Sequence, residues 1–135
     1  MTTDYGFRAT LNVPYPEAVE KATAALKAEG FGVLTEIDVR ATLKKKLGAD
    51  FRRYVILGAC NPPLAHRALQ TDLEIGLLLP CNVIVYETGE GESVVSIVNP
   101  LAMLGVVENP ELQAVAEEAN RRLRRVIESL SAQGL

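Results

Sequence analysis

The sequence contains a single histidine, His66, and this scarcity restricts the mechanisms open to the chain. A blue-copper site needs two histidines and is excluded by count. A serine triad would have to recruit one of four serines to His66, and none of the four lies in a nucleophile elbow. The chain also lacks a dinucleotide-binding fingerprint, a phosphate-binding P-loop and the paired histidines of metalloproteases. The sequence therefore indicates neither acyl hydrolysis nor nucleotide chemistry.

Cysteine is almost as scarce, because the sequence contains only two, Cys60 and Cys81. A chain of 135 residues can bury an adequate core without a disulfide, so we expect free thiols. The longest nearly uncharged apolar stretch, Ile75 to Tyr86, is interrupted by Pro80 and is too short to span a bilayer. The first residues show neither the basic start nor the apolar run of a signal peptide. We therefore expect a cytoplasmic protein with no membrane partner.

An excess of basic residues is also missing, since 14 Lys and Arg stand against 17 Asp and Glu, for a net charge of -3. Neutralising phosphates requires a basic face, so no nucleic-acid partner is expected. Hydrophobic residues make up 48% and charged residues 23% of the chain, which is typical of an ordinary globular protein. No linker or internal repeat divides the sequence, and we expect one domain over residues 1–135.

Hydrophobic periodicity predicts five strands and two long helices. The expected strands are residues 7–13, 31–37, 53–59, 82–88 and 93–98, and the expected long helices are residues 16–29 and a final helix with Asn109 as N-cap and Pro110 at its first position. Two short helices should lie between the middle strands, one from Asp38 to Gly48 and one over residues 64–71 with Asn61 as N-cap. The apolar stretch 101–107 is expected to be a loop that covers the sheet or a partner subunit.

This order of elements predicts an α+β fold with two layers. We expect a largely antiparallel five-stranded sheet with the two long helices on one face, in the order β-α-β4-α with the two short helices inserted. The opposite sheet face should be covered by inserts or by a partner, because Val55 to Leu57, Leu77 to Leu79 and Val83 to Val85 are strongly apolar. We therefore predict a homodimer.

Two groups of basic residues have a structural interpretation. Glu117 and Glu118 precede Arg121 and Arg122 by four residues, which predicts ion pairs along a solvated face of the last helix. The run Lys44 to Lys46 lies near the end of a helix, where cations are favoured. We interpret this run as a solvated helix end, with an anion or an acidic partner as the alternative.

The chemically versatile residues gather around the two cysteines. Cys60 precedes a helix N-terminus, whose dipole can lower the pKa of a thiol, although Pro62 and Pro63 remove two hydrogen-bond donors there. Cys60 and Cys81 are the candidate nucleophiles. Cys60, His66 and Cys81 are weak candidates for metal ligands, because their spacing matches no regular zinc pattern. A thiolate and thioether site for cuprous ion is not excluded by count. We expect no bound cofactor.

Several short runs of the sequence carry a family pattern. They are Gly58-Ala59-Cys60-Asn61-Pro62, the positions Ala65, Ala68 and Leu69, the stretch Ile75 to Val83 with its Leu-Leu-Pro-Cys-Asn run, Asn99-Pro100, and Met103. With Gly30-Phe31 and Leu47-Gly48 they extend over nearly the whole chain, which resembles the domain of unknown function 302 family. The resemblance implies a small α+β domain of the helix-grip kind and fits a dimer, but it assigns no activity.

The family pattern also implies one shared site. Its positions in this sequence are Asn61, Pro62, Pro80, Cys81, Asn82, Pro100 and Met103. Cys60 matches the pattern less firmly, so a mechanism that requires both thiols is not implied.

Three functions remain open from the sequence. The first is a non-enzymatic homodimeric module that binds a small ligand or an ion, with Asn61, His66, Asn82 and Met103 as candidate ligand-binding residues beside the cysteines. The second is a thiol-dependent redox or sulfur-handling enzyme in which Cys60 or Cys81 is the nucleophile and His66 assists. The third is a purely structural interaction module.

Overall fold

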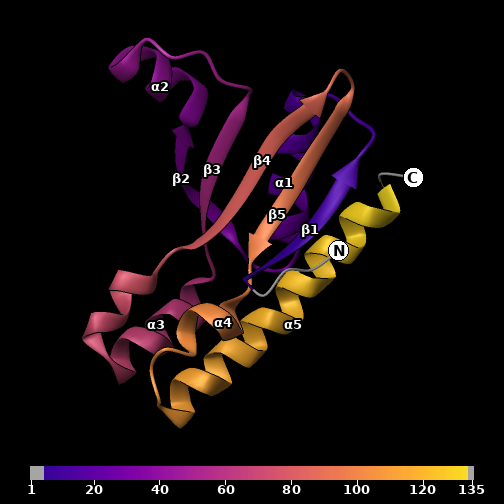
Figure 1. Cartoon of the computed structure of the whole chain (residues 1–135). Helices are drawn as coiled ribbons and strands as arrows, with labels where there is room; N and C mark the ends of the chain where they lie inside the picture. The colour runs from indigo at the N-terminus through magenta and orange to yellow at the C-terminus, as the bar shows by residue number, and fades with distance from the viewer. Residues whose placement is uncertain (1–4, 134–135) are drawn as a thin grey trace.

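The computed structural model describes residues 5–133 and contains one antiparallel five-stranded sheet with the order β1-β5-β4-β3-β2 (Figure 1). The strands are β1 (Gly6–Leu11), β2 (Gly32–Asp38), β3 (Tyr54–Cys60), β4 (Cys81–Gly89) and β5 (Glu92–Val98). The α-helices are α1 (Tyr15–Ala28), α2 (Val39–Leu47), α3 (Pro62–Thr71), α4 (Pro100–Leu104) and α5 (Pro110–Gln133), with a 3-10 helix η1 (Leu73–Leu78). The predicted α+β fold is confirmed.

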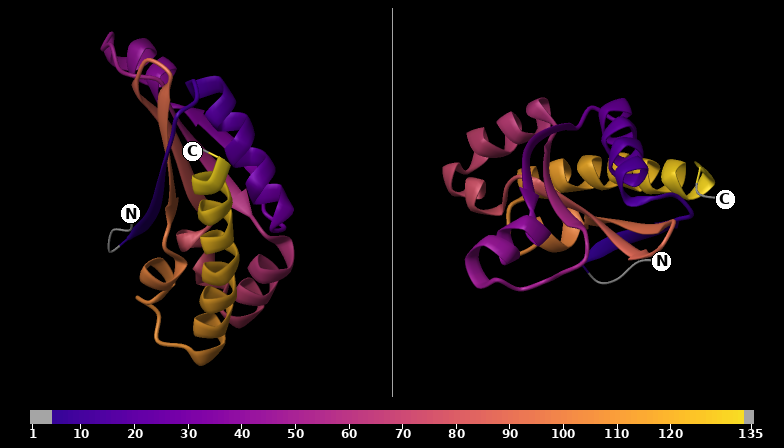
Figure 2. Two further views of the ribbon diagram at one scale, coloured as in Figure 1. Left: turned by 90° about the vertical axis from the view of Figure 1, so that its right-hand side faces the viewer. Right: turned by 90° about the horizontal axis from the view of Figure 1, so that it is seen from above.

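Helices α1 and α5 cover one face of the sheet, as the apolar periodicity predicted (Figure 2). Alternate residues of the strands point toward these helices, because successive side chains of a strand point to opposite faces. Leu57, Val83 and Val85 are fully buried on this side, where they pack with Leu26 of α1 and Leu123 of α5. This cluster is the main hydrophobic core.

Capping residues set the ends of the helices where the sequence indicated them. The Asp38 side chain accepts a hydrogen bond from the backbone N–H of Ala41, and Gly48 ends α2 with a left-handed φ of 66°. Asn109 accepts hydrogen bonds from the N–H groups of Glu111 and Leu112 at the start of α5. These caps satisfy donors that the first turn of a helix leaves free.

The structure differs from the sequence prediction in two helical segments. The stretch expected to be an apolar loop begins with helix α4, which Asn99 caps by accepting a hydrogen bond from the N–H of Leu101. Residues 73–78, for which no element was predicted, form η1 after an Asp72 cap. Both segments belong to a second hydrophobic cluster with α3 and the start of α5. No single segment had the length or periodicity to predict this cluster.

The ion pairs of α5 also differ in part from those that the sequence predicts. Glu118 pairs with Arg122, as predicted, but it also pairs with Arg121 at 2.6 Å, in place of the expected Glu117 partner. Arg122 also donates a hydrogen bond to the backbone carbonyl of Glu29, and Arg125 pairs with the Glu29 carboxylate. Residues of α5 therefore anchor the end of α1 as well as forming a solvated face.

The opposite face of the sheet is not covered by a helix (Figure 2). We call it the open face, and the side chains of Ile37, Tyr54, Ile56, Ile84 and Tyr86 lie on it. Ile37 is 50% exposed, and the other four are half-buried by their neighbours. No helix within residues 5–133 has the length and apolar character needed to cross a membrane.

Candidate functional site

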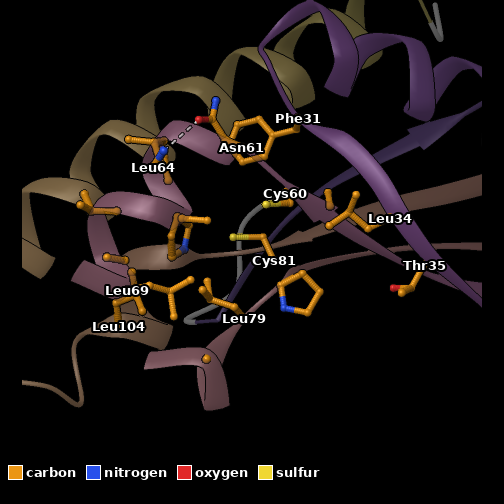
Figure 3. Close-up of a pocket in the computed structure, with 18 residues that line it drawn as sticks. Phe31, Leu34, Thr35, Cys60, Asn61, Leu64, Leu69, Leu79, Cys81 and Leu104 are labelled. Carbon is orange, nitrogen blue, oxygen red and sulfur yellow. Dashed lines mark hydrogen bonds between the residues drawn. The ribbon is translucent and has the colours of Figure 1, made fainter. Parts of the chain in front are cut away.

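A pocket of about 340 Å³ lies at one end of the sheet, where β3 ends and β4 begins (Figure 3). It separates the main core from the second hydrophobic cluster, and residues of both form its wall. Its lining is almost wholly apolar and consists of Phe31, Leu34, Thr35, Ala59, Cys60, Asn61, Leu64, Ala65, Ala68, Leu69, Gly76, Leu79, Pro80, Cys81, Pro100, Leu104, Val115 and Ala119.

Strand register brings the two cysteines together in this wall. Cys81, the first residue of β4, is paired with Ala59, so it lies next to Cys60 at the end of β3. Figure 3 shows both sulfur atoms inside the pocket, and both thiols are free. Cys81 is buried and Cys60 is half-buried. The predicted free thiols are therefore neighbours in one apolar environment.

That environment raises the pKa of both thiols. Burial, with a smaller contribution from the neighbouring Cys60, raises the pKa of Cys81 to about 11. Burial also raises the pKa of Cys60 above its ordinary value. Desolvation disfavours the charged form of a thiol, so the pKa of Cys60 is raised rather than lowered as its place before the N-terminus of α3 suggested. Both groups are therefore neutral thiols at neutral pH.

Asn61 connects the pocket wall to α3. Its side-chain oxygen accepts a hydrogen bond from the N–H of Leu64 at 3.1 Å, as predicted for the N-cap, and the residue is only 6% exposed. Its amide nitrogen lies against Gly30, whose positive φ of 84° ends α1. Asn61 thus fixes the direction in which α3 leaves the sheet, and the pocket forms between that helix and the strand ends.

The other predicted ligand-binding residues do not line the pocket. His66 lies on an exposed part of α3, and Asn82 is exposed on the opposite side of the sheet from Cys81. Met103 is half-buried between the two hydrophobic clusters without contributing to the lining. Pro62 also lies outside it, whereas Pro80 and Pro100 are in the wall.

The structure does not assemble the proposed metal ligands. Within residues 5–133, no three His, Cys, Asp or Glu side chains lie together in a way that could hold a metal ion. Cys60 and Cys81 are adjacent, but His66 on the exposed side of α3 does not join them. The trio Cys60, His66 and Cys81 is therefore not a ligand set.

Sequence reasoning missed most of the apolar wall. Phe31 and Leu34 come from the segment after α1, Leu104 comes from α4, and Val115 and Ala119 come from α5. These residues are far apart in the sequence and have the appearance of ordinary core positions. One signal was available, because the small residues Ala65 and Ala68 recur on one side of α3 and leave space beside it.

The comparisons with known proteins identify a family without an assigned activity. The family model described as "Domain of unknown function DUF302" matches residues 7–130. A solved structure, "Crystal structure of uncharacterized conserved protein DUF302 from Bacillus stearothermophilus", is similar with a TM-score of 0.83 and 32% sequence identity, over 93% of this chain and 97% of that chain. No protein of curated function matches the sequence. The chain therefore belongs to the DUF302 family.

Proposed function

We propose that this domain is a non-enzymatic binding module that takes a small, uncharged, apolar ligand into the pocket between its two hydrophobic clusters. The observation that carries the proposal is the partly open apolar pocket of about 340 Å³. Ligand pockets of proteins occupy roughly 300–1,000 Å³ and are lined mainly by apolar side chains.

The chemistry of the wall supports an uncharged ligand. The described residues that line the pocket include no Asp, Glu, Lys, Arg or His. The Asn61 oxygen is already engaged by the N–H of Leu64, and both cysteines are neutral. A charged ligand would lose its hydration without gaining a partner, which is strongly unfavourable.

A thiol-dependent enzyme is less well supported. Nucleophilic cysteines act as thiolates and lie in environments that lower their pKa. Burial in this pocket has the opposite effect on Cys60 and Cys81. The one residue expected to assist them, His66, is exposed and outside the pocket. The adjacent sulfurs instead contribute a polarizable apolar surface.

Binding of the uncharged dye N-phenylnaphthylamine tests this function. We expect its fluorescence to rise on mixing with the protein, and to rise much less with Leu34→Asp, which places a charge at the pocket wall. Leu73→Asp is the matched control, since Leu73 is 84% exposed, Leu34 is 69% exposed, and Leu73 does not line the pocket. Equal dye binding by the two variants, or none by the native protein, would contradict the proposal.

A second pair of variants tests the pocket by volume. Ala65→Phe fills the space from α3, and it should abolish dye binding without a change in charge. Ala24→Phe places the same side chain on an exposed position of α1 and should leave binding unchanged. Circular dichroism and urea unfolding establish that each variant is folded.

A further inference from the structure

We propose that the open face and helix α2 form the interface of a homodimer in which the α2 segment of each copy lies over the β4–β5 hairpin of the other. The partner is a second copy of this chain. The open-face side chains of Ile37, Tyr54, Ile56, Ile84 and Tyr86 do not line the ligand pocket.

The open face has the composition of an interface centre. The side chains that the central strands β3 and β4 present there are Tyr54, Ile56, Asn82, Ile84 and Tyr86, and none is charged. The rings of Tyr54 and Tyr86 are stacked at 5.4 Å, and the Phe51 ring lies 6.2 Å from Tyr54. Aromatic residues are enriched and charged residues depleted at the centres of protein interfaces.

Helix α2 packs only loosely on β2 and β3 of its own chain. None of its nine residues is buried, and Leu47 at its end is exposed. Both views in Figure 2 show α2 standing out from the sheet on the side of the open face. Tertiary packing of an apolar face supplies most of the stability of a helix in a protein. A second copy that sits on the open face would contact α2 and supply that packing.

The charges around the open face favour a second copy. Residues 39–53, which include α2, carry six basic groups and one acidic group, whereas residues 87–92 of the hairpin carry three acidic groups and no basic one. Lys44 pairs with Asp50, but Lys45, Lys46 and Glu90 make no ion pair with any residue in the range 5–133. The two segments are thus oppositely charged, and each carries charged side chains that form no ion pair within the described chain.

Symmetry brings these segments together. In Figure 1, α2 and the β4–β5 hairpin lie at the same end of the sheet, on opposite sides of β3. A two-fold axis parallel to the strands in front of the open face exchanges the two sides. Each basic α2 segment then meets the acidic hairpin of the partner, twice per dimer. A two-fold interface requires such a self-complementary patch.

The open face and α2 together present an area comparable to that of a standard protein interface. Five strands spaced about 4.8 Å apart and about 20 Å long present roughly 500 Å² in projection. A nine-residue helix about 13 Å long adds roughly 130 Å². Side-chain relief makes the accessible area larger than this projection, and a standard interface buries about 800 Å² per partner.

Light scattering coupled to size exclusion tests the proposal. We expect the native protein at micromolar concentration to have twice the monomer mass of 14.6 kDa. The variant Lys45→Glu/Lys46→Glu, and separately Glu90→Lys/Glu92→Lys, should weaken the dimer about tenfold or more through like-charge contacts. The chain that carries all four substitutions should dimerise again, because it restores opposite charges at both contacts.

Controls separate this interface from other effects. Lys21→Glu/Lys27→Glu makes the same charge change on α1, away from the open face, and should leave the dimer intact. Ile37→Lys, at a half-exposed position of the open face, should weaken the dimer without unfolding the chain. The proposal would be overturned if the native protein were a monomer under all conditions, or if the charge-reversal variants dimerised as well as the native protein. It would also be overturned if the chain with all four substitutions did not regain the dimer. Dye binding in the pocket is a separate measurement, and it tests the proposed ligand-binding function independently of the dimer.

Discussion

Gly58 of β3 lies directly against the ring of Pro80. A Cβ atom on Gly58 would lie 2.8 Å from Cγ of Pro80 and 2.2 Å from Oγ1 of Thr35. Pro80 follows a cis peptide bond and precedes Cys81, so the contact joins the end of β3 to the start of β4. Both Pro80 and Thr35 line the pocket, and the missing side chain of Gly58 therefore allows the pocket wall to close.

We predict that Gly58→Ala destabilises the protein by about 1–3 kcal/mol, because the added methyl group overpacks this contact. Thr35 can rotate away, but the Pro80 ring cannot. The measurement is the midpoint of urea unfolding, with Gly32→Ala as control, since a Cβ at Gly32 meets nothing within 4 Å. If the two variants unfolded at the same urea concentration, the contact would not be restrictive.

The N-cap of α3 gives a second prediction. Asn61→Ala should lower the free energy of unfolding by about 1 kcal/mol, because it removes the acceptor for the N–H of Leu64. Asn61→Ser keeps a hydroxyl acceptor and should restore most of the loss. Because Asn61 also positions α3 along the pocket, dye binding should weaken in the alanine variant and recover with serine. A loss of stability that serine does not reduce would exclude capping as the cause.

Thiol reactivity gives a third prediction. Iodoacetamide reacts with the thiolate, so both cysteines should label more slowly than a free thiol at pH 8, and Cys81 should be the slower of the two. With a pKa of about 11, only about one part in a thousand of Cys81 is ionised at that pH. Mass spectrometry of Cys60→Ala and Cys81→Ala resolves the two rates. Labelling of either cysteine faster than the free thiol would restore the thiol-enzyme hypothesis.

The same burial predicts a loss of stability at alkaline pH. The pKa of Cys81 is about 11 in the folded protein and about 9.0 when exposed, so below pH 9 both states keep the proton and stability is unaffected. As the pH rises from 9 to 11, the unfolded state loses its proton first, and the free energy of unfolding should fall by up to about 3 kcal/mol. Urea unfolding of native protein and Cys81→Ala across this range measures the difference. Parallel curves would show that Cys81 is not desolvated.

Local patterns in the sequence predicted most of the fold. Alternating apolar residues located all five strands, and Asp38, Asn61 and Asn109 marked helix starts because the capping interaction spans only two or three residues. The sequence predicts a loop where α4 forms, because the five residues of this helix are too few to show helical periodicity. An isolated turn of this kind forms only through its packing on α5 and η1.

The site was predictable only in part. Cys60, Asn61 and Cys81 are close to one another because they flank two paired strands, and pairing of neighbouring strands could be expected from the sequence. His66 and Met103 were included because of their chemistry, but whether a helical residue points toward a cavity depends on how the helix is rotated. That rotation is set by the local cap at Asn61 and by packing against Val115 of α5, and the packing joins segments that are distant in the sequence.

The division of the hydrophobic interior by the pocket has a consequence for cooperativity. The sheet packs with α1 and the later part of α5, whereas α3, η1 and α4 pack with the start of α5. The two clusters are joined by helix α5 and by side chains that contact both, which include Leu64 and Met103. Regions with few shared contacts open independently in native-state hydrogen exchange. An occupant in contact with Phe31 on one side and Leu104 on the other would make the two clusters exchange as one. Amide protection in α3 is thus a direct reporter of an occupied pocket.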